Sequence, residues 1–357
     1  QTFSDEHDCS NAICIPDLPE IAYPRYAYQA STVQGQVLWD QYQSTGKIRY
    51  LRHALTVHQK ADSLAERLQQ KLYIGSDNAS LARNSRQIYP YAVGACHYLS
   101  GSEQAEKPGS YYSEKAFYLS EKGKTLQLLE GLSKVRQSRS QSLPDSLGDN
   151  LRTLTDTINE LRAEQNQNPE TSQTYQKQLV DLRTRKKDLL EDLKQEHPDF
   201  YAISFHDQIV GLEQLQRSLQ QENRTLVTYT YHDSLLMGIG VTPDRVVIKR
   251  LETPLNFASK VEQYRNQLAD QQRYDQQLSY TFYRRLFKPF EDLGQTSGIV
   301  IIPDGPISHL AFGTLARSAQ PEASPDYLVR DYAFTYSPSA SLWVKEQNET
   351  ASQQTPS

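Results

Sequence analysis

Cysteine and histidine are the residue types in this chain that could support nucleophilic catalysis. Cys96 lies within a run of helical periodicity, and His309 follows the apolar run Ile299–Ile302 and the Pro-Asp-Gly-Pro turn at 303–306. A catalytic thiolate needs an exposed, polarising environment close to a histidine base. Cys96 is instead flanked by alanine, histidine and tyrosine in mid-helix, which predicts packing. We therefore expect Cys96 and His309 to form no catalytic pair, and we interpret His309 as a turn residue.

Other patterns that carry catalysis or ligand binding are missing or weak. The sequence has no Gly-x-Ser-x-Gly elbow and no His-Glu-x-x-His. Gly238-Ile-Gly240 lies inside a run of predicted antiparallel strands, whereas a phosphate loop joins a strand to a helix. Cys9, Cys14 and His7 are too few ligands for a zinc site, and we favour unpaired thiols in a flexible arm over a disulfide. We assign no catalytic, cofactor-binding or metal-binding residue.

Composition narrows the class of protein further. A chain of 357 residues is long enough for two or three domains, and three cysteines do not make a disulfide framework. A net charge of -5 provides no electrostatic basis for binding nucleic acid or an anionic membrane. No run approaches the roughly 20 apolar residues that span a bilayer. We expect a soluble, cytoplasmic protein that binds neither nucleic acid nor a membrane.

The first half of the chain has the periodicity of paired helices. After an arm over residues 1–24, the segment 33–55 places apolar residues at helical spacing on both sides of a Thr45-Gly46 stop. A second copy covers 91–119, where Ser100-Gly101 takes the place of Thr45-Gly46. This pattern resembles tetratricopeptide repeats, and we assign 25–143 to such repeats. An ordinary helical bundle with accidental similarity is the alternative.

Residues 144–200 follow a stricter period. Leucine, isoleucine and tyrosine recur at spacings of three and four from Leu147 to Leu161 and from Tyr175 to Leu193, on both sides of an Asn/Pro-containing turn, with Lys186 interrupting the second run. This spacing predicts an antiparallel helical hairpin with coiled-coil character. Its charges are mixed in sign, so we favour a solvated face over a basic binding patch.

From residue 201 to 345 the pattern is typical of an α/β domain. A short helix is predicted within 209–219, and three strands at 225–231, 234–241 and 245–251 predict an antiparallel meander. Two helices should follow, the first starting from Leu255 and the second near Leu278. The run 299–302 predicts a strand buried on both faces, 310–315 a helix or turn, and 332–336 a last strand. Residues 346–357 are polar and predict a linker.

The segments 299–315 and 327–342 resemble the CHAT family, whose caspase- and separase-like domains often follow tetratricopeptide repeats. The family pattern is a strand, Pro-Asp-Gly, an apolar turn, a Leu-x-x-Asp-Tyr strand and a Pro-Ser-Ala-Ser helix start. The residues that match it are Pro303, Asp304, Gly305, Leu310, Phe312, Asp331, Tyr332, Pro338, Ser339, Ala340 and Ser341. The segment 113–129 is similar to the last repeat helix before such domains.

The resemblance implies a cysteine peptidase, a hydrolase that cleaves a protein substrate and whose repeats bind a protein partner. In the family, the catalytic histidine and cysteine follow later strands, downstream of the Pro-Ser-Ala-Ser segment. We therefore expect a mainly α chain: helical repeats, a coiled hairpin, and only the first, non-catalytic part of a caspase-like α/β domain. Such a chain should be inactive alone. Two alternatives remain, a non-enzymatic scaffold with a degenerate protease-like domain and an unrelated α/β small-molecule binder.

Overall fold

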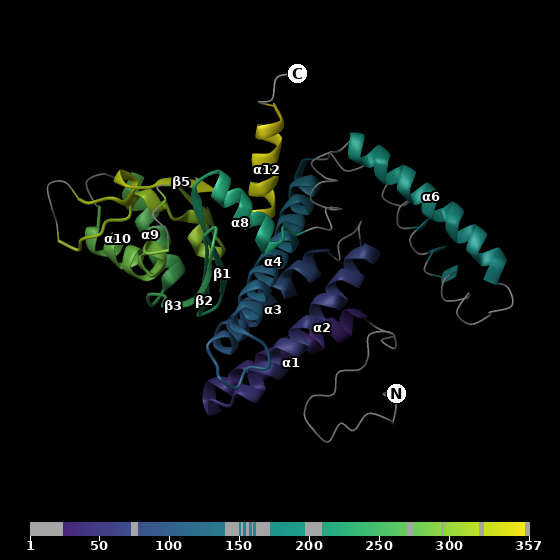
Figure 1. Cartoon of the computed structure of the whole chain (residues 1–357), viewed down its shortest axis with the longest axis horizontal. Helices are drawn as coiled ribbons and strands as arrows, with labels where there is room; N and C mark the ends of the chain where they lie inside the picture. The colour runs from purple at the N-terminus through teal and green to yellow at the C-terminus, as the bar shows by residue number, and fades with distance from the viewer. Residues whose placement is uncertain are drawn as a thin grey trace. The chain divides into compact units, whose positions relative to one another are not determined.

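The computed structural model describes most of the chain, which is mainly helical with one small mixed sheet (Figure 1). The described residues are 24–72, 78–139, 150, 153–154, 157–158, 160–161, 172–196, 209–269, 274–293, 296, 298–320 and 325–353. The predicted arm lies outside them up to residue 23, as do Cys9, Cys14 and His7. No helix within these ranges has the length and apolar character needed to cross a membrane.

The chain divides into two compact units, each built from three segments. The first contains Gln1–Gln34, Thr56–Ser85 and Thr125–Asp207, and the second contains Gly35–Leu55, Arg86–Lys124 and Gln208–Ser357. Each unit therefore takes part of the helical region. The predicted domain boundaries remain predictions.

Four long helices form the N-terminal half. They are α1 (Pro24–Thr45), α2 (Ile48–Leu72), α3 (Asn78–Ser100) and α4 (Gly109–Arg139). Gly46 adopts a positive φ of 68° and its N–H donates to the Tyr42 carbonyl at 2.8 Å, which ends α1 where the sequence predicted a stop. The two predicted helix-turn-helix pairs are thus confirmed as secondary structure.

In the first unit, α2 buries polar as well as apolar side chains. His58 and Asp62 lie one turn apart and are both buried, among Val57, Ala61 and Leu64. Burial lowers the pKa of His58 to about 4, so its imidazole is neutral. Neither ring nitrogen of His58 has a hydrogen-bond partner among the described residues.

The first unit also contains α6 (Ser172–Glu196), the second helix of the predicted hairpin. Its Leu179 is buried, and Tyr175, Leu182 and Leu189 are half-buried on the same side, as the predicted seam requires. The helix predicted before it, from Leu147 to Leu161, lies mostly outside the described residues.

The second unit is organised around a five-stranded sheet in the order β3-β2-β1-β4-β5. Its strands are β1 (Arg224–His232), β2 (Leu235–Val241), β3 (Val246–Leu251), β4 (Gly298–Ile302) and β5 (Ala333–Tyr336). The first three form the predicted antiparallel meander, whereas β4 pairs in parallel with both β1 and β5. Every residue of β4 is buried, as predicted for its all-apolar sequence.

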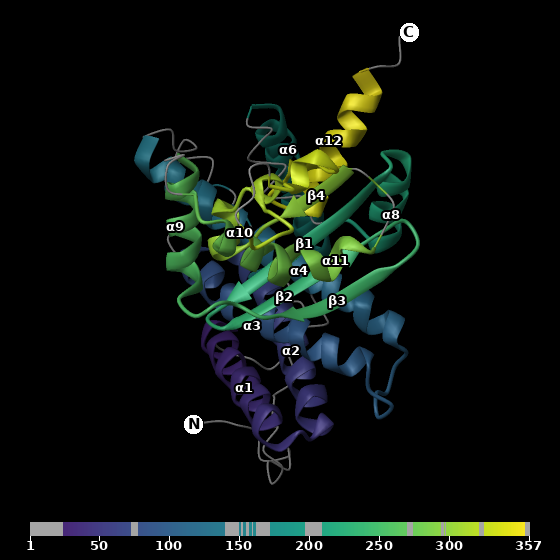
Figure 2. The same ribbon diagram turned by 90° about the vertical axis from the view of Figure 1, so that its left-hand side faces the viewer.

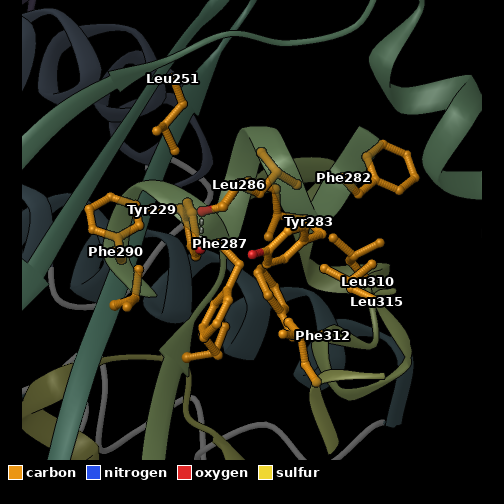
Figure 3. Close-up of a cluster of buried hydrophobic side chains, with 14 of the residues drawn as sticks. Tyr229, Leu251, Phe282, Tyr283, Leu286, Phe287, Phe290, Leu310, Phe312 and Leu315 are labelled. Carbon is orange, nitrogen blue, oxygen red and sulfur yellow. Dashed lines mark hydrogen bonds between the residues drawn. The ribbon is translucent and has the colours of Figure 1, made fainter. Parts of the chain in front are cut away.

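Helices after the meander cover one face of this sheet (Figures 1 and 2). They are α9 (Phe257–Ala269), α10 (Gln276–Phe282), a π-helical turn over Tyr283–Phe287, and α11 (Lys288–Glu291). Figure 3 shows their aromatic side chains around Tyr229 of β1, whose hydroxyl donates to the Leu286 carbonyl at 3.0 Å. Tyr229 also stacks on Phe312 with ring centroids 5.6 Å apart. This cluster is the core of the α/β part.

The same core explains Gly238-Ile-Gly240. A Cβ atom on Gly238 would lie 2.5 Å from Cζ of Phe290, so the glycines allow α11 to pack closely on β2. The remaining helices of the unit are α8 (Leu212–Gln221), which matches the predicted short helix, and α12 (Ala340–Gln353).

The helix or turn predicted at 310–315 is confirmed as the 3-10 turn Phe312–Thr314, but two other predictions about local structure were wrong. Leu255 is 82% exposed and precedes α9, because Asn256 adopts a positive φ of 57° and starts the helix only at Phe257. Residues 346–353 belong to α12 although a polar linker was predicted, since a helix needs no apolar face where it is solvated; Lys345 and Glu349 pair along it at 3.7 Å.

Candidate functional site

The residues that first suggested nucleophilic chemistry are not brought together. Cys96 is fully buried in α3, and burial raises the pKa of its thiol to about 12, so the thiolate is absent at neutral pH. His309 is exposed at the end of the 3-10 turn Gly305–His309, as predicted for a turn residue. His97 packs beside Tyr98 and bonds the Ile248 carbonyl, and burial lowers its pKa.

The two segments that carry the family resemblance lie close to one turn of α4, which bonds to Ser341 of the second segment and to β1 beside the first. The first segment turns at Pro303-Asp304-Gly305, directly after β4. Gly305 has a positive φ of 55°, and a Cβ atom there would lie 2.7 Å from Cδ1 of Tyr231. Asp304 is buried, and its Oδ2 accepts a hydrogen bond of 2.8 Å from the Tyr231 N–H.

This turn completes the hydrogen bonding of β1. The pairing of β1 with β4 ends at Thr228 and Ile302, while β1 continues against β2 as far as His232. The Tyr229 carbonyl and the Tyr231 N–H are two residues apart, so they point to the same side of β1, where β4 has ended. Asp304 satisfies the N–H, and Lys124 of α4 satisfies the carbonyl with a bond of 2.6 Å from its Nζ.

The second segment starts α12. Ser339 is the N-cap residue, and its Oγ accepts from the Leu342 N–H at 3.1 Å. Glu121 of α4 reaches the same helix start: its Oε2 accepts from the N–H of Ser341 at 3.1 Å and from the Ser341 hydroxyl at 3.2 Å. A carboxylate at a helix N-terminus is stabilised by the free N–H groups and by the helix dipole. The Ser-Ala-Ser sequence thus ends a loop and binds an acidic side chain.

We call Glu121, Lys124, Asp304 and Ser341 the α4 junction. Glu121 and Lys124 are three residues apart on one face of α4, and both are buried. Burial raises the pKa of Glu121 and lowers that of Lys124, while Asp304 and Glu121 favour the charged form of Lys124. The junction places two carboxyl groups and a lysine amine in a site shielded from water, where each group depends on the others.

The α4 junction was missed from the sequence, although a signal is present. Phe117, Glu121 and Lys124 follow the four-three spacing of the buried face of α4, and Phe117 is itself buried. Charged residues at core positions of a periodic helix indicate a buried polar contact. An opposite pair three apart is more often a surface ion pair, and the sequence alone does not tell the two apart.

The Asp331-Tyr332 part of the resemblance is held by a separate ion cluster. Arg317 donates to Glu291 of α11 at 2.9 Å, to Asp326 at 3.3 Å and to Asp331 at 2.5 Å. Its guanidinium also lies over the Tyr332 ring, 5.6 Å from the centroid. Through Arg317, these contacts hold the loop before β5, which contains Asp326 and Asp331, against Glu291 of α11.

Neither cluster has the groups of a hydrolytic centre. The α4 junction holds two carboxyl groups, a lysine amine and a hydroxyl, but Lys124 bonds a backbone carbonyl, and the Glu121 oxygen that accepts from the Ser341 hydroxyl also accepts from the Ser341 N–H at the start of α12. Within the described ranges, no group of three or more histidine, cysteine or acidic residues could hold a metal ion. The arrangement can fix the positions of α12 and of the turn after β4 relative to α4.

Comparison with known proteins adds no relative: a scan against models of protein families finds no match, and a search of curated proteins finds none either.

Proposed function

We propose that this chain is a partner-binding helical-repeat region joined to the first, non-catalytic part of a caspase-like cysteine peptidase domain. The complete protein would be a cysteine peptidase that acts on a protein substrate and is controlled by a protein partner bound to the repeats. The observation that carries the proposal is the α4 junction. The second segment that resembles the CHAT family bonds through Ser341 to the helix that resembles the last repeat helix. The first segment reaches that helix through β1, where Asp304 and Lys124 bond to backbone groups two residues apart.

The sheet supports this assignment at the level of architecture. A parallel core of β1, β4 and β5 with helices on one face is compatible with the first part of a caspase-like α/β domain. A partner that bends or shifts α4 would act directly on the start of α12 through Glu121, and through Lys124 on β1, to which the turn after β4 is bonded. The proposed role of the α4 junction is to transmit partner binding to the peptidase domain.

The test of the peptidase assignment uses the complete reading frame. We expect a strand followed by His-Gly and a later strand followed by cysteine downstream of Ser357, and we expect a peptidyl electrophile to label that cysteine. The matched control replaces the downstream cysteine with alanine and should abolish labelling. A stop codon, or substitution of either position, would rule out the peptidase and favour the non-enzymatic scaffold.

Both the peptidase proposal and the scaffold alternative expect no reactive thiol among the described residues. Cys96, the cysteine that the structure describes, has a buried thiol with a raised pKa. The purified chain should therefore leave Cys96 unmodified by the same electrophile at pH 7. Labelling of Cys96 in the folded protein would contradict our interpretation of both Cys96 and the missing catalytic pair.

A further inference from the structure

A cavity of about 410 Å³ lies beside α9 in the second unit and shares no residue with the α4 junction. It is lined by Gln267, Leu268, Tyr274, Gly313, Thr314, Tyr327 and Val329. Its volume is in the range of sites that bind small molecules, about 300–1,000 Å³. Val329 is 63% exposed, so this part of the lining is open to solvent.

The walls of the cavity are held in place by bonds that do not involve an occupant. The Thr314 carbonyl accepts from the Tyr264 hydroxyl at 2.8 Å and from the Tyr274 hydroxyl at 3.3 Å. The rings of Tyr274 and Tyr327 meet edge to face, with centroids 5.9 Å apart. A ligand would therefore meet a preformed surface and lose little free energy in ordering it.

One polar group in the lining has no hydrogen-bond partner in the part of the chain that the structure describes. The side-chain Oε1 of Gln267 is buried, and no described residue donates a hydrogen bond to it. Leaving a buried acceptor unsatisfied costs free energy, which a bound hydrogen-bond donor would recover. None of the seven lining residues is charged, so an ionic ligand would lose its hydration without meeting an opposite charge.

We propose that this cavity binds a neutral aromatic group with one hydrogen-bond donor, such as an indole. The donor bonds Oε1 of Gln267, and the ring packs against Tyr274, Tyr327 and Leu268. Aromatic contacts of this kind contribute binding free energy beyond that of the apolar area that they bury. This proposal does not depend on the proposed peptidase function, because it rests only on the lining of the cavity and on Oε1 of Gln267.

The test compares two ring systems of nearly identical shape, indole and benzofuran, in a ligand-observed NMR titration of the full chain. Indole has an N–H donor where benzofuran has an oxygen acceptor. We expect indole to bind at least about fivefold more tightly, the ratio that corresponds to one hydrogen bond of about 1 kcal/mol. N-acetyl-tryptophanamide tests whether the natural ligand is a peptide side chain or a free small molecule. Tighter binding than that of indole indicates a tryptophan side chain of a peptide, and weaker binding indicates a free small molecule.

Two variants assign the binding to the cavity. Gln267→Met removes the acceptor and should abolish the preference for indole, whereas Gln263→Met changes an exposed glutamine of the same helix and should keep it. Val329→Phe narrows the rim and should weaken both ligands, whereas Leu255→Phe at another exposed site should not. Equal affinity for the two rings, no binding of either ring at millimolar concentration, or an indole preference that survives Gln267→Met would overturn the proposal.

Discussion

Lys124 donates a hydrogen bond of 2.6 Å from its buried Nζ to the backbone carbonyl of Tyr229, 105 residues along the chain. The bond joins α4 to β1, the central strand of the sheet, where β1 extends beyond the end of β4. A lysine satisfies this carbonyl while remaining close to the carboxylates of Asp304 and Glu121. This contact determines what substitutions in α4 should do.

Lys124→Met should destabilise the protein by about 3 kcal/mol. The substitution leaves the Tyr229 carbonyl unsatisfied and removes the cation that Asp304 and Glu121 face, and breaking a buried ionic contact typically costs about 3–5 kcal/mol. Denaturant unfolding followed by fluorescence measures the change. The matched control is Lys107→Met at an exposed lysine, which should change stability by less than about 0.5 kcal/mol. Similar values for the two variants would contradict the importance of the contact.

Glu121→Ala should loosen the start of α12, and Glu121→Gln should do so less. Alanine removes the acceptor of the Ser341 N–H, whereas glutamine retains an oxygen at the same position but not the charge that the helix N-terminus favours. Hydrogen exchange of the Ser341 amide should therefore accelerate strongly in the alanine variant and moderately in the glutamine variant. The Leu342 amide, which Ser339 caps, serves as an internal reference. Unchanged exchange at Ser341 in the alanine variant would refute the role of Glu121.

Gly305→Ala should cost more stability than Gly46→Ala. Both glycines have a positive φ, so both substitutions incur the backbone strain of about 1 kcal/mol. A Cβ atom at Gly46 meets open space, but at Gly305 it would lie 2.7 Å from the Tyr231 ring. The difference between the two unfolding free energies isolates this steric contact. Equal losses would show that the ring moves aside freely.

His58 should make the stability of the protein depend on acid pH. Its folded pKa of about 4 lies below the ordinary value of 6.5, because burial favours the neutral imidazole. The stabilisation from this shift is fully present above pH 6.5 and is lost as the pH falls through 4. By linkage, unfolding free energy should drop by about 3 kcal/mol between pH 7 and pH 4 from this residue alone.

His58→Leu is the variant that tests this dependence. It should remove that part of the pH dependence, and it should also raise stability at pH 7, since the buried ring nitrogens of His58 have no partner among the described residues. His309→Leu, at an exposed histidine, should leave the acid sensitivity of the parent protein. Parallel pH profiles for the His58 variant and the parent would contradict the burial of a neutral imidazole.

The pattern of nearby residues in the sequence was sufficient to predict most helices and strands of the fold. Thr45-Gly46 predicted the end of α1, the alternation from Thr225 to Leu251 predicted the meander, and the apolar run Ile299–Ile302 predicted a buried strand. Each of these signals depends on neighbours within a few residues, through glycine torsions or the period of a helix or strand. The predictions that were wrong, at Leu255 and after Glu346, concern helix ends, where a single turn residue or solvated helix faces decide the outcome.

The sequence by itself determined the helical pairs, the strands and the segments that resemble a peptidase family. It could not determine that Glu121 and Lys124 are buried, since an i,i+3 pair of opposite charges has the same local pattern on a surface and in a core. Only the tertiary structure decided this, because β4 ends before β1 and leaves two backbone groups that α4 and Asp304 must satisfy. It likewise brought Gln267 and Tyr327, 60 positions apart in the numbering, to one cavity. Contacts between distant segments arise from strand order and helix packing, and no local periodicity encodes them.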